Sequence, residues 1–160
     1  MVGIRERKHR LSPEFYCGKV VVSFTASIRN KQLYLNETTT FKHLSNILLD
    51  ALNHWACDAH VFLFMPDHCH LLIGSREEGS DLLEFMKEFK QRSGYWFSKS
   101  MPTFQPIKWQ KDFYDHILRK DEDIQKQVFY ILENPVRKGL VANWKEYPFK
   151  GSTLYNFDEW

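Results

Sequence analysis

The strongest pattern along the chain is a pair of apolar runs separated by a two-residue turn. Residues 57–65 and 68–75 have strand length and are rich in Val, Phe, Leu and Ile. Pro66 and Asp67, which stand between the two runs, are residues that favour turns. The pattern therefore predicts two adjacent antiparallel strands.

The same criteria predict the remaining elements. Apolar residues that recur every three or four positions predict helices, and runs rich in Val, Ile and Phe predict strands. Ser80 or Asp81 can cap the second helix, and Pro135 stops the last one. The predicted segments are a strand at 19–28, a helix at 38–54, a helix at about 81–99, a strand-like segment at 108–118 and a helix at 120–134.

The order strand, helix, strand, strand, helix, strand is the split βαβ, ferredoxin-like (RRM-like) pattern. We therefore predict an α+β fold in which two helices cover one face of an antiparallel sheet and the C-terminal helix covers part of the other face. A length of 160 residues suggests a single domain over residues 1–160. Within it, residues 1–17 are expected to form an irregular basic arm and residues 150–160 an irregular tail.

Two histidines open the second of the paired strands. Side chains alternate across a strand, so His68 and His70 should share one face while Cys69 points to the other. Two neutral imidazoles on one face can bind a single metal ion. A lone His-x-His is common by chance, so the metal hypothesis depends on where this pair stands, directly after the turn and in a strand otherwise rich in Leu and Ile.

The last predicted helix carries a second candidate for chemistry. At 100° per residue, Ile124, Val128 and Ile131 form an apolar stripe, and Tyr130 and Asn134 lie one turn apart on its flank. If this helix packs near the histidine strand, the tyrosine is a candidate nucleophile and the amide a candidate metal ligand. Alternatively, the tyrosine only packs at a boundary, and an Asn before Pro only ends the helix.

The net charge of +2 says little about partners, but basic residues are concentrated in the N-terminal arm and in the segment 85–111. The second segment also contains Trp, Tyr and Phe, a mixture that suits single-stranded nucleic acid through phosphate contacts and base stacking. Alternatively, its lysines form only the solvated face of a helix. The residues that we expect to contact DNA are Arg5, Arg7, Lys8, Arg10, Lys87, Lys90, Arg92 and Arg119.

The composition also indicates a compartment. The chain is 43% hydrophobic, enough for a sizeable core, and its three cysteines form no Cys-x-x-Cys pair. An odd number of cysteines fits a reducing environment. The N-terminus has no apolar signal core and no run approaches transmembrane length, so we expect a cytoplasmic protein without a membrane partner.

Taken together, these motifs resemble a known family of enzymes. Residues 65–73 (Met-Pro-Asp-His-Cys-His-Leu-Leu-Ile) resemble the His-hydrophobe-His motif of the HUH single-strand DNA endonucleases. Residues 109–119, with Trp-Gln, Tyr-Asp-His and Arg, and residues 130–140 (Tyr-Ile-Leu-Glu-Asn-Pro-Val-Arg-Lys-Gly-Leu) are similar to the tyrosine transposases of insertion sequences, in particular the REP-associated branch. The resemblance extends from about Cys17 to Phe149, nearly the whole chain.

The resemblance implies a transposase-like single-strand DNA endonuclease and strand transferase. His68 and His70 would bind Mg²⁺ or Mn²⁺, and Asn134 would add a polar ligand where the family often has Gln. Tyr130 would attack the DNA phosphorus, which gives a 5′-phosphotyrosine link and a free 3′-OH. The implied partner is single-stranded or hairpin DNA, and the chain would act as a monomer or as a homodimer.

Two other functions remain open, as does the choice of nucleophile. One is a domesticated hairpin DNA-binding protein with little or no cleavage. The other is a metal-dependent phosphoesterase that uses activated water, which would need more ligands than the pair, with His60 the only nearby addition. Tyr114 is a competing nucleophile, but Asp112 and Asp115 beside it would oppose an incoming phosphate and raise the pKa of its phenol.

Overall fold

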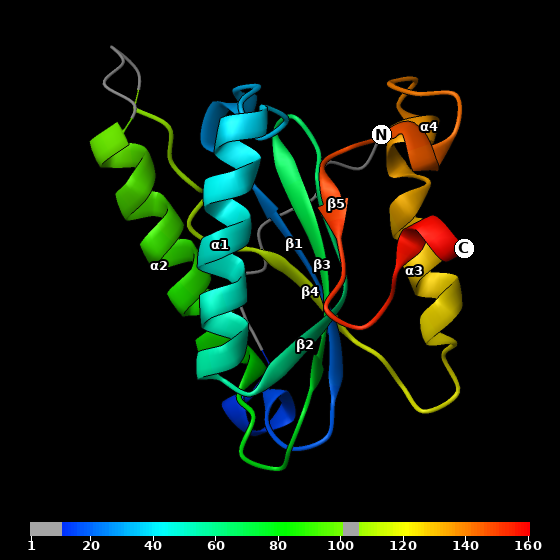
Figure 1. The fold of residues 1–160 in the computed structure, drawn as a ribbon. Coiled ribbons are helices and arrows are strands. Elements are labelled where there is room, and N and C mark those ends of the chain that lie inside the picture. Colours follow the sequence, from blue (N-terminus) through cyan, green and yellow to red (C-terminus); the bar gives the residue numbers. More distant parts are fainter. Residues whose placement is uncertain (1–10, 101–105) are drawn as a thin grey trace.

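The computed structural model describes residues 11–100 and 106–160, and its centre is a five-stranded sheet (Figure 1). The strand order is β4-β1-β3-β2-β5, and every neighbouring pair is antiparallel. The strands are β1 (Val21–Ser27), β2 (Cys57–Phe64), β3 (His68–Ser75), β4 (Tyr114–Ile117) and β5 (Lys150–Gly151). The histidine strand β3 is therefore the middle strand.

Helices cover both faces of the sheet (Figure 1). Helices α1 (Thr38–His54) and α2 (Leu82–Ser100) lie on one face, and α3 (Ile124–Leu132) and the short α4 (Asn134–Arg137) lie on the other. The Asp81 carboxylate accepts hydrogen bonds from the backbone N–H groups of Leu83 and Glu84, which caps α2. The predicted α+β, ferredoxin-like arrangement, with two helices on one face and a C-terminal helix on the other, is confirmed.

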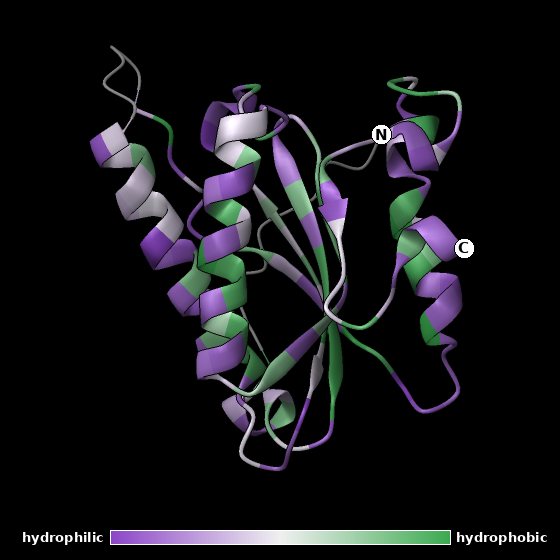
Figure 2. Ribbon diagram, in the orientation of Figure 1, coloured by the Kyte–Doolittle hydropathy of each residue, from purple (hydrophilic) through white to green (hydrophobic). Residues whose placement is uncertain are grey.

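The alternation of β3 separates two hydrophobic cores. Cys69, Leu71 and Ile73 pack with α1 and α2 in the larger core, whereas Leu72 packs with α3 in the smaller one. Figure 2 shows hydrophilic and hydrophobic residues alternating at the start of β3, followed by hydrophobic ones. Because His70 stands two residues before Leu72, both histidines lie on the α3 face of the sheet.

Two predicted segments are shorter in the structure. The last helix begins at Ile124 rather than at residue 120, because the Asp123 side chain caps the backbone N–H groups of Gln125 and Lys126. Of the segment 108–118, only Tyr114–Ile117 forms a ladder with β1, while Trp109 makes an isolated bridge to Ile28.

The tail expected to be irregular instead completes the sheet. Residues Lys150 and Gly151 form β5 and pair with Leu63 and Phe62 of β2. Near the other terminus, Pro13–Tyr16 forms a short 3-10 helix where an irregular arm was expected. Both pieces are too short to have a recognisable period in the sequence.

We predict that Gly151 is required for β5 to dock. A Cβ atom at this position would lie 2.3 Å from Cζ of the buried Phe62 ring, so Gly151→Ala forces the ring or the strand to move. Overpacking of this kind costs about 1–3 kcal/mol of unfolding free energy, which urea denaturation measures. Gly79→Ala is the matched control, since its nearest atom would be a flexible Glu77 oxygen at 3.5 Å. A Gly151→Ala variant as stable as the parent would contradict the prediction.

Candidate functional site

His68 and His70 meet at the start of β3. Their Nε2 atoms are 3.1 Å apart, and the two rings are nearly perpendicular. The outer nitrogen of each ring is also held: Nδ1 of His68 lies 2.6 Å from the Asp67 carboxylate, and Nδ1 of His70 lies 3.2 Å from the Thr25 hydroxyl. Both imidazoles are therefore fixed in orientation by a neighbour.

The environment keeps His70 neutral. Burial, followed by the nearby charges of His68 and Arg137, lowers the pKa of His70 to about 3. Its imidazole is thus unprotonated at neutral pH and has a lone pair to offer. The Asp67 carboxylate can only accept a hydrogen bond, so the proton of a neutral His68 lies on Nδ1 and its Nε2 lone pair faces His70.

These donors fit a divalent metal ion. Two ligands at right angles on an octahedral ion, each about 2.1 Å from it, are about 3.0 Å apart. The Nε2 atoms have this spacing, and hydrogen bonding of the outer nitrogen is the usual way to orient a ligating histidine. Within residues 11–100 and 106–160, no group of three or more His, Cys, Asp or Glu side chains could hold a metal. Any ion bound here would need its remaining ligands from other groups, from DNA or from water.

Two residues that orient the histidines were missed as site residues in the sequence. Asp67 was interpreted only as a turn residue, although its place directly before His68 was a usable signal. Thr25 lies opposite His70 in the β1–β3 ladder, and that register is visible only in the structure.

Tyr130 lies on the same side of the sheet, on α3. Its side chain is 64% exposed, and the Arg137 guanidinium lies over its ring at 4.2 Å from the centroid. Nη2 of Arg137 also donates a hydrogen bond of 2.6 Å to the Tyr130 carbonyl oxygen. Arg137 is in addition close enough to His70 to lower its pKa. The charge of this arginine, which the sequence did not single out, thus acts on His70 while its side chain contacts the tyrosine.

Asn134 stands at the junction of α3 and α4. Its Nδ2 donates to the Ile131 carbonyl oxygen at 3.1 Å, and its side chain is half-buried. This bond orients the amide and leaves its Oδ1 as an acceptor that could serve a metal ion. Its role as a ligand stays a prediction.

The structure brings the competing tyrosine to the same face. Thr25 lies opposite His70 on one side and opposite Tyr114 on the other, so the three side chains form one row across β3, β1 and β4. Asp115 is on the other face, where it is buried and accepts a hydrogen bond from the Tyr16 hydroxyl. The expectation that Asp115 would oppose a phosphate at Tyr114 is therefore wrong, because alternation sends its carboxylate into the larger core.

The predicted DNA contacts on α2 lie away from the histidines. Lys87, Lys90 and Arg92 are on α2, which covers the opposite face of the sheet (Figure 1). Lys87 pairs with Glu84 and Arg92 with Asp50, while Lys90 donates to the carbonyl oxygens of residues 110 and 111. Any DNA that these residues contact would lie outside the histidine site.

The remaining predicted contacts fall elsewhere. Arg5, Arg7, Lys8 and Arg10 lie outside the described residues. Arg119 follows β4, is exposed, and has Nε 3.9 Å from the Glu122 carboxylate. His60 lies on β2 near Gly74, at the opposite end of β3 from His68 and His70, so it does not extend the histidine pair.

Comparisons with known proteins agree with the fold and the motifs. A family model described as "Transposase IS200 like" matches residues 18–134. A "REP-associated tyrosine transposase" of Escherichia coli (strain K12) is 25% identical over 126 residues, which cover 79% of this chain and 72% of that protein. A Haemophilus influenzae protein described as a candidate member of the same class is 26% identical over 60% of this chain and 59% of its own length.

A solved structure gives the same fold. The structure of a REP-associated tyrosine transposase bound to a REP hairpin superposes with a TM-score of 0.74 at 24% identity, covering 90% of this chain and 81% of that one. Among the helices in the described part of the chain, none is long and apolar enough to cross a membrane.

We predict that binding of Mn²⁺ needs both histidines. His68→Ala and His70→Ala should each lower the affinity at least tenfold, because either change leaves one imidazole, and Asp67→Asn should lower it about tenfold by loosening His68. Isothermal titration calorimetry with Mn²⁺ measures these affinities. His54→Ala is the control, since this histidine is exposed on α1 and paired with Glu88. Parent-like affinity in both histidine variants would rule out the metal site.

Proposed function

We propose that this chain, which belongs to the IS200-like transposase family, cleaves and rejoins single-stranded DNA next to a hairpin, with Tyr130 as the nucleophile and a divalent metal ion on His68 and His70. One observation carries the proposal. Two oriented imidazoles face each other at 3.1 Å on the α3 side of the sheet, and Arg137, which lies over the Tyr130 ring, adds positive charge near His70.

The metal proposal rests on His68 and His70, with Asn134 as the candidate third ligand. A bound Mg²⁺ or Mn²⁺ ion would supply Lewis-acid polarisation of the scissile phosphate. The chain's own part is to keep His70 neutral through burial and to orient both imidazoles through the Asp67 and Thr25 contacts.

The covalent step requires a phenol oxygen that can reach phosphorus. The Tyr130 oxygen would form a bond to phosphorus while the bond from phosphorus to the 3′ oxygen breaks. The phenol loses its proton and the departing 3′ oxygen gains one, so the phosphodiester is replaced by a 5′-phosphotyrosine and a free 3′-OH. Attack by another 3′-OH reverses the step and joins two DNA ends without a nucleotide cofactor.

Arg137 supports this role for Tyr130. Its hydrogen bond to the Tyr130 carbonyl and its position over the ring hold the guanidinium beside the phenol. A guanidinium there can bind the negatively charged phosphate that the tyrosine would attack. It would also balance part of the charge that builds up as the phosphate reacts.

The polar half of the α3 face supports a DNA partner. In the β1 and β4 ladders, Ser23, Thr25, Tyr114 and His116 share this face with His70, while the apolar half lies under α3. Hydroxyl and imidazole groups of this kind can donate hydrogen bonds to phosphate oxygens. The REP hairpin bound by the structural relative suggests hairpin DNA as the class of partner.

The packing of α3 supports action as a monomer. Val128, Ile131 and Leu132 of α3 pack against β2 and β3 of the same chain. The tyrosine helix thus packs within its own chain. Exchange of this helix between two copies would first have to expose these residues to water.

One observation favours the second candidate, a hairpin-binding protein with little cleavage. In the described part of the chain only two imidazoles, and no group of three His, Cys, Asp or Glu residues, are available to a metal. A site with so few ligands binds metal weakly, whereas hairpin binding would not need it. Because both candidate functions include hairpin binding, only a measurement of DNA cleavage distinguishes them.

We predict that the protein binds a hairpin with a single-stranded flank more tightly than blunt duplex DNA of the same length. The polar row beside His70 is suited to an unpaired strand, and phosphate contacts make the affinity fall steeply with salt. Fluorescence anisotropy at several salt concentrations measures both effects. Tighter binding to blunt duplex, or an affinity that salt does not change, would contradict this prediction.

We predict that Tyr130→Phe abolishes the covalent adduct and preserves folding and DNA binding. The change removes one oxygen from a side chain that is 64% exposed, so the packing of α3 is hardly affected. The assay is a labelled hairpin oligonucleotide with Mn²⁺, followed by a denaturing gel.

Tyr114→Phe is the matched control, because Tyr114 is the other tyrosine of the histidine face. The parent and Tyr114→Phe should give a protein–DNA adduct, and Tyr130→Phe should not. An adduct that persists in Tyr130→Phe but disappears in Tyr114→Phe would transfer the nucleophile to β4. Hairpin binding without an adduct in the parent would favour the second candidate.

A further inference from the structure

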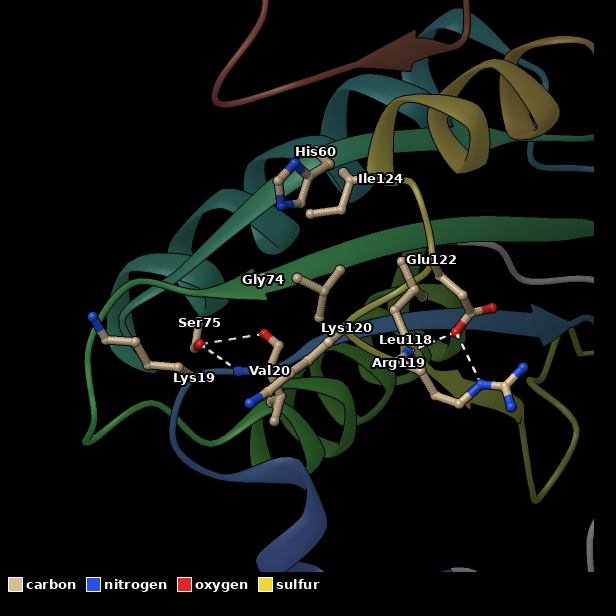
Figure 3. Close-up of a pocket in the computed structure, with 11 residues that line it drawn as sticks. Lys19, Val20, His60, Gly74, Ser75, Leu118, Arg119, Lys120, Glu122 and Ile124 are labelled. Atoms are coloured by element: carbon tan, nitrogen blue, oxygen red, sulfur yellow. Dashed lines mark hydrogen bonds and ion pairs between the residues drawn. The ribbon is translucent and has the colours of Figure 1, made fainter.

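A cleft opens on the α3 face, at the far end of β3 from the histidine pair (Figure 3). Its volume is about 610 Å³, within the range of ligand sites. The start of β1, the end of β3 and the segment between β4 and α3 line it. Gly74 in its wall stands four residues after His70 on the same strand, about 13 Å away.

A β-bulge places a histidine in this cleft. The β2–β3 register shifts between Ala59 and Val61, so that His60 is the extra residue. Its Nδ1 lies 2.8 Å from the Tyr155 hydroxyl, and a Cβ on Gly74 would lie 2.9 Å from its Nε2. The imidazole is thus held from one side by the C-terminal tail, and the glycine leaves room for it on the other.

The rim of the cleft is basic. Lys19, Arg119 and Lys120 line it together with one acid, Glu122. The Glu122 carboxylate already accepts hydrogen bonds from Nε2 of His116 and from the Arg119 backbone N–H. In the described part of the chain neither lysine has an ion pair, and Figure 3 shows Lys120 extending across the cleft toward Val20.

The wall below this rim is largely apolar. Val20, Val21, Leu118 and Ile124 contribute aliphatic surface from β1 and from both sides of the β4–α3 connection. An apolar wall under a cationic rim matches a nucleotide, whose base is flat and apolar on its faces and whose phosphate is anionic.

We propose that this cleft binds one unpaired nucleotide of the DNA strand that crosses the histidine site. The inference rests on the proposed function, because it takes the occupant from the same strand. Lys19 and Lys120 contact the phosphate, and the base packs on the aliphatic wall beside His60. The cleft then holds the strand at a fixed distance from His70 and determines which phosphate reaches Tyr130.

The charge of the rim is tested by the salt dependence of binding. The probe is a labelled hairpin with a ten-nucleotide single-stranded flank, measured by fluorescence anisotropy. Lys19→Ala/Lys120→Ala should weaken binding about tenfold and reduce the slope of log affinity against log salt by about 0.7 for each phosphate that these lysines neutralise in the parent. Lys42→Glu makes the same change in net charge on α1, on the opposite face of the sheet, and should leave the slope unchanged.

The wall is tested by removing single bases from the flank. In the parent, an abasic site at one or two positions should weaken binding about fivefold, and other positions should have little effect. Leu118→Trp fills the cleft and should remove this position dependence, after thermal melting has shown that the variant is folded.

The outcomes separate this inference from the proposed function. A reduced slope in the lysine variant and a position-dependent abasic effect support the cleft even if the parent forms no adduct. A parent that forms the Tyr130 adduct, with an unchanged slope in Lys19→Ala/Lys120→Ala, overturns the cleft alone. A flat abasic profile in the parent, or no DNA binding at all, also overturns it. Binding of free dTMP that depends on the two lysines, without any change in the DNA slope, would assign the cleft to a free nucleotide instead.

Discussion

The structure depends on the alternation of side chains along β3, the middle strand of the sheet. Its odd-numbered apolar residues enter the core under α1 and α2, and its even-numbered residues face α3. A shift of one residue in the register would bury His68 and His70 in the larger core and turn Leu71 and Ile73 out of it. The hydrophobic energy of the two cores thus fixes which way the imidazoles point, before any metal or DNA is present.

The two ends of the α3 face differ in what covers the sheet. Beside His70 the neighbouring strands offer the hydroxyl groups of Thr25 and Tyr114. Toward the middle of the face, Val128 and Leu132 of α3 pack on Leu63 and Leu72 of the sheet and bury them. At the far end the bulge at His60 reopens the face into a basic cleft. The same surface therefore combines a packed centre with two accessible ends, an arrangement suited to an extended ligand.

The neutral state of His70 is a consequence of folding. Burial lowers the pKa of His70 far below its value in an unfolded chain, where a histidine is half protonated near pH 6.5. The unfolded chain thus binds more protons than the native one between these two values, so this residue destabilises the native state as the pH falls through that range. The native state tolerates this destabilisation because a core of large aromatic residues, such as Phe24, Phe64 and Phe89, stabilises the fold.

The sequence by itself determined the main helices and the strands β1 to β3, their order and the shared face of the histidines, because these follow from local periodicity and from the alternation of a strand. It also identified Tyr130 and Asn134 as neighbours, because they are one helical turn apart. Only the tertiary structure decided which residues from distant segments meet: Thr25 with His70, Thr25 with Tyr114, and β5 with β2. The tertiary structure also places the basic residues of α2 on the opposite face of the sheet from the histidine pair, and it directs the Asp115 side chain into the larger core. Register, bulges and the packing of one layer on another set these contacts, and they depend on residues far apart in the chain, so no local pattern encodes them.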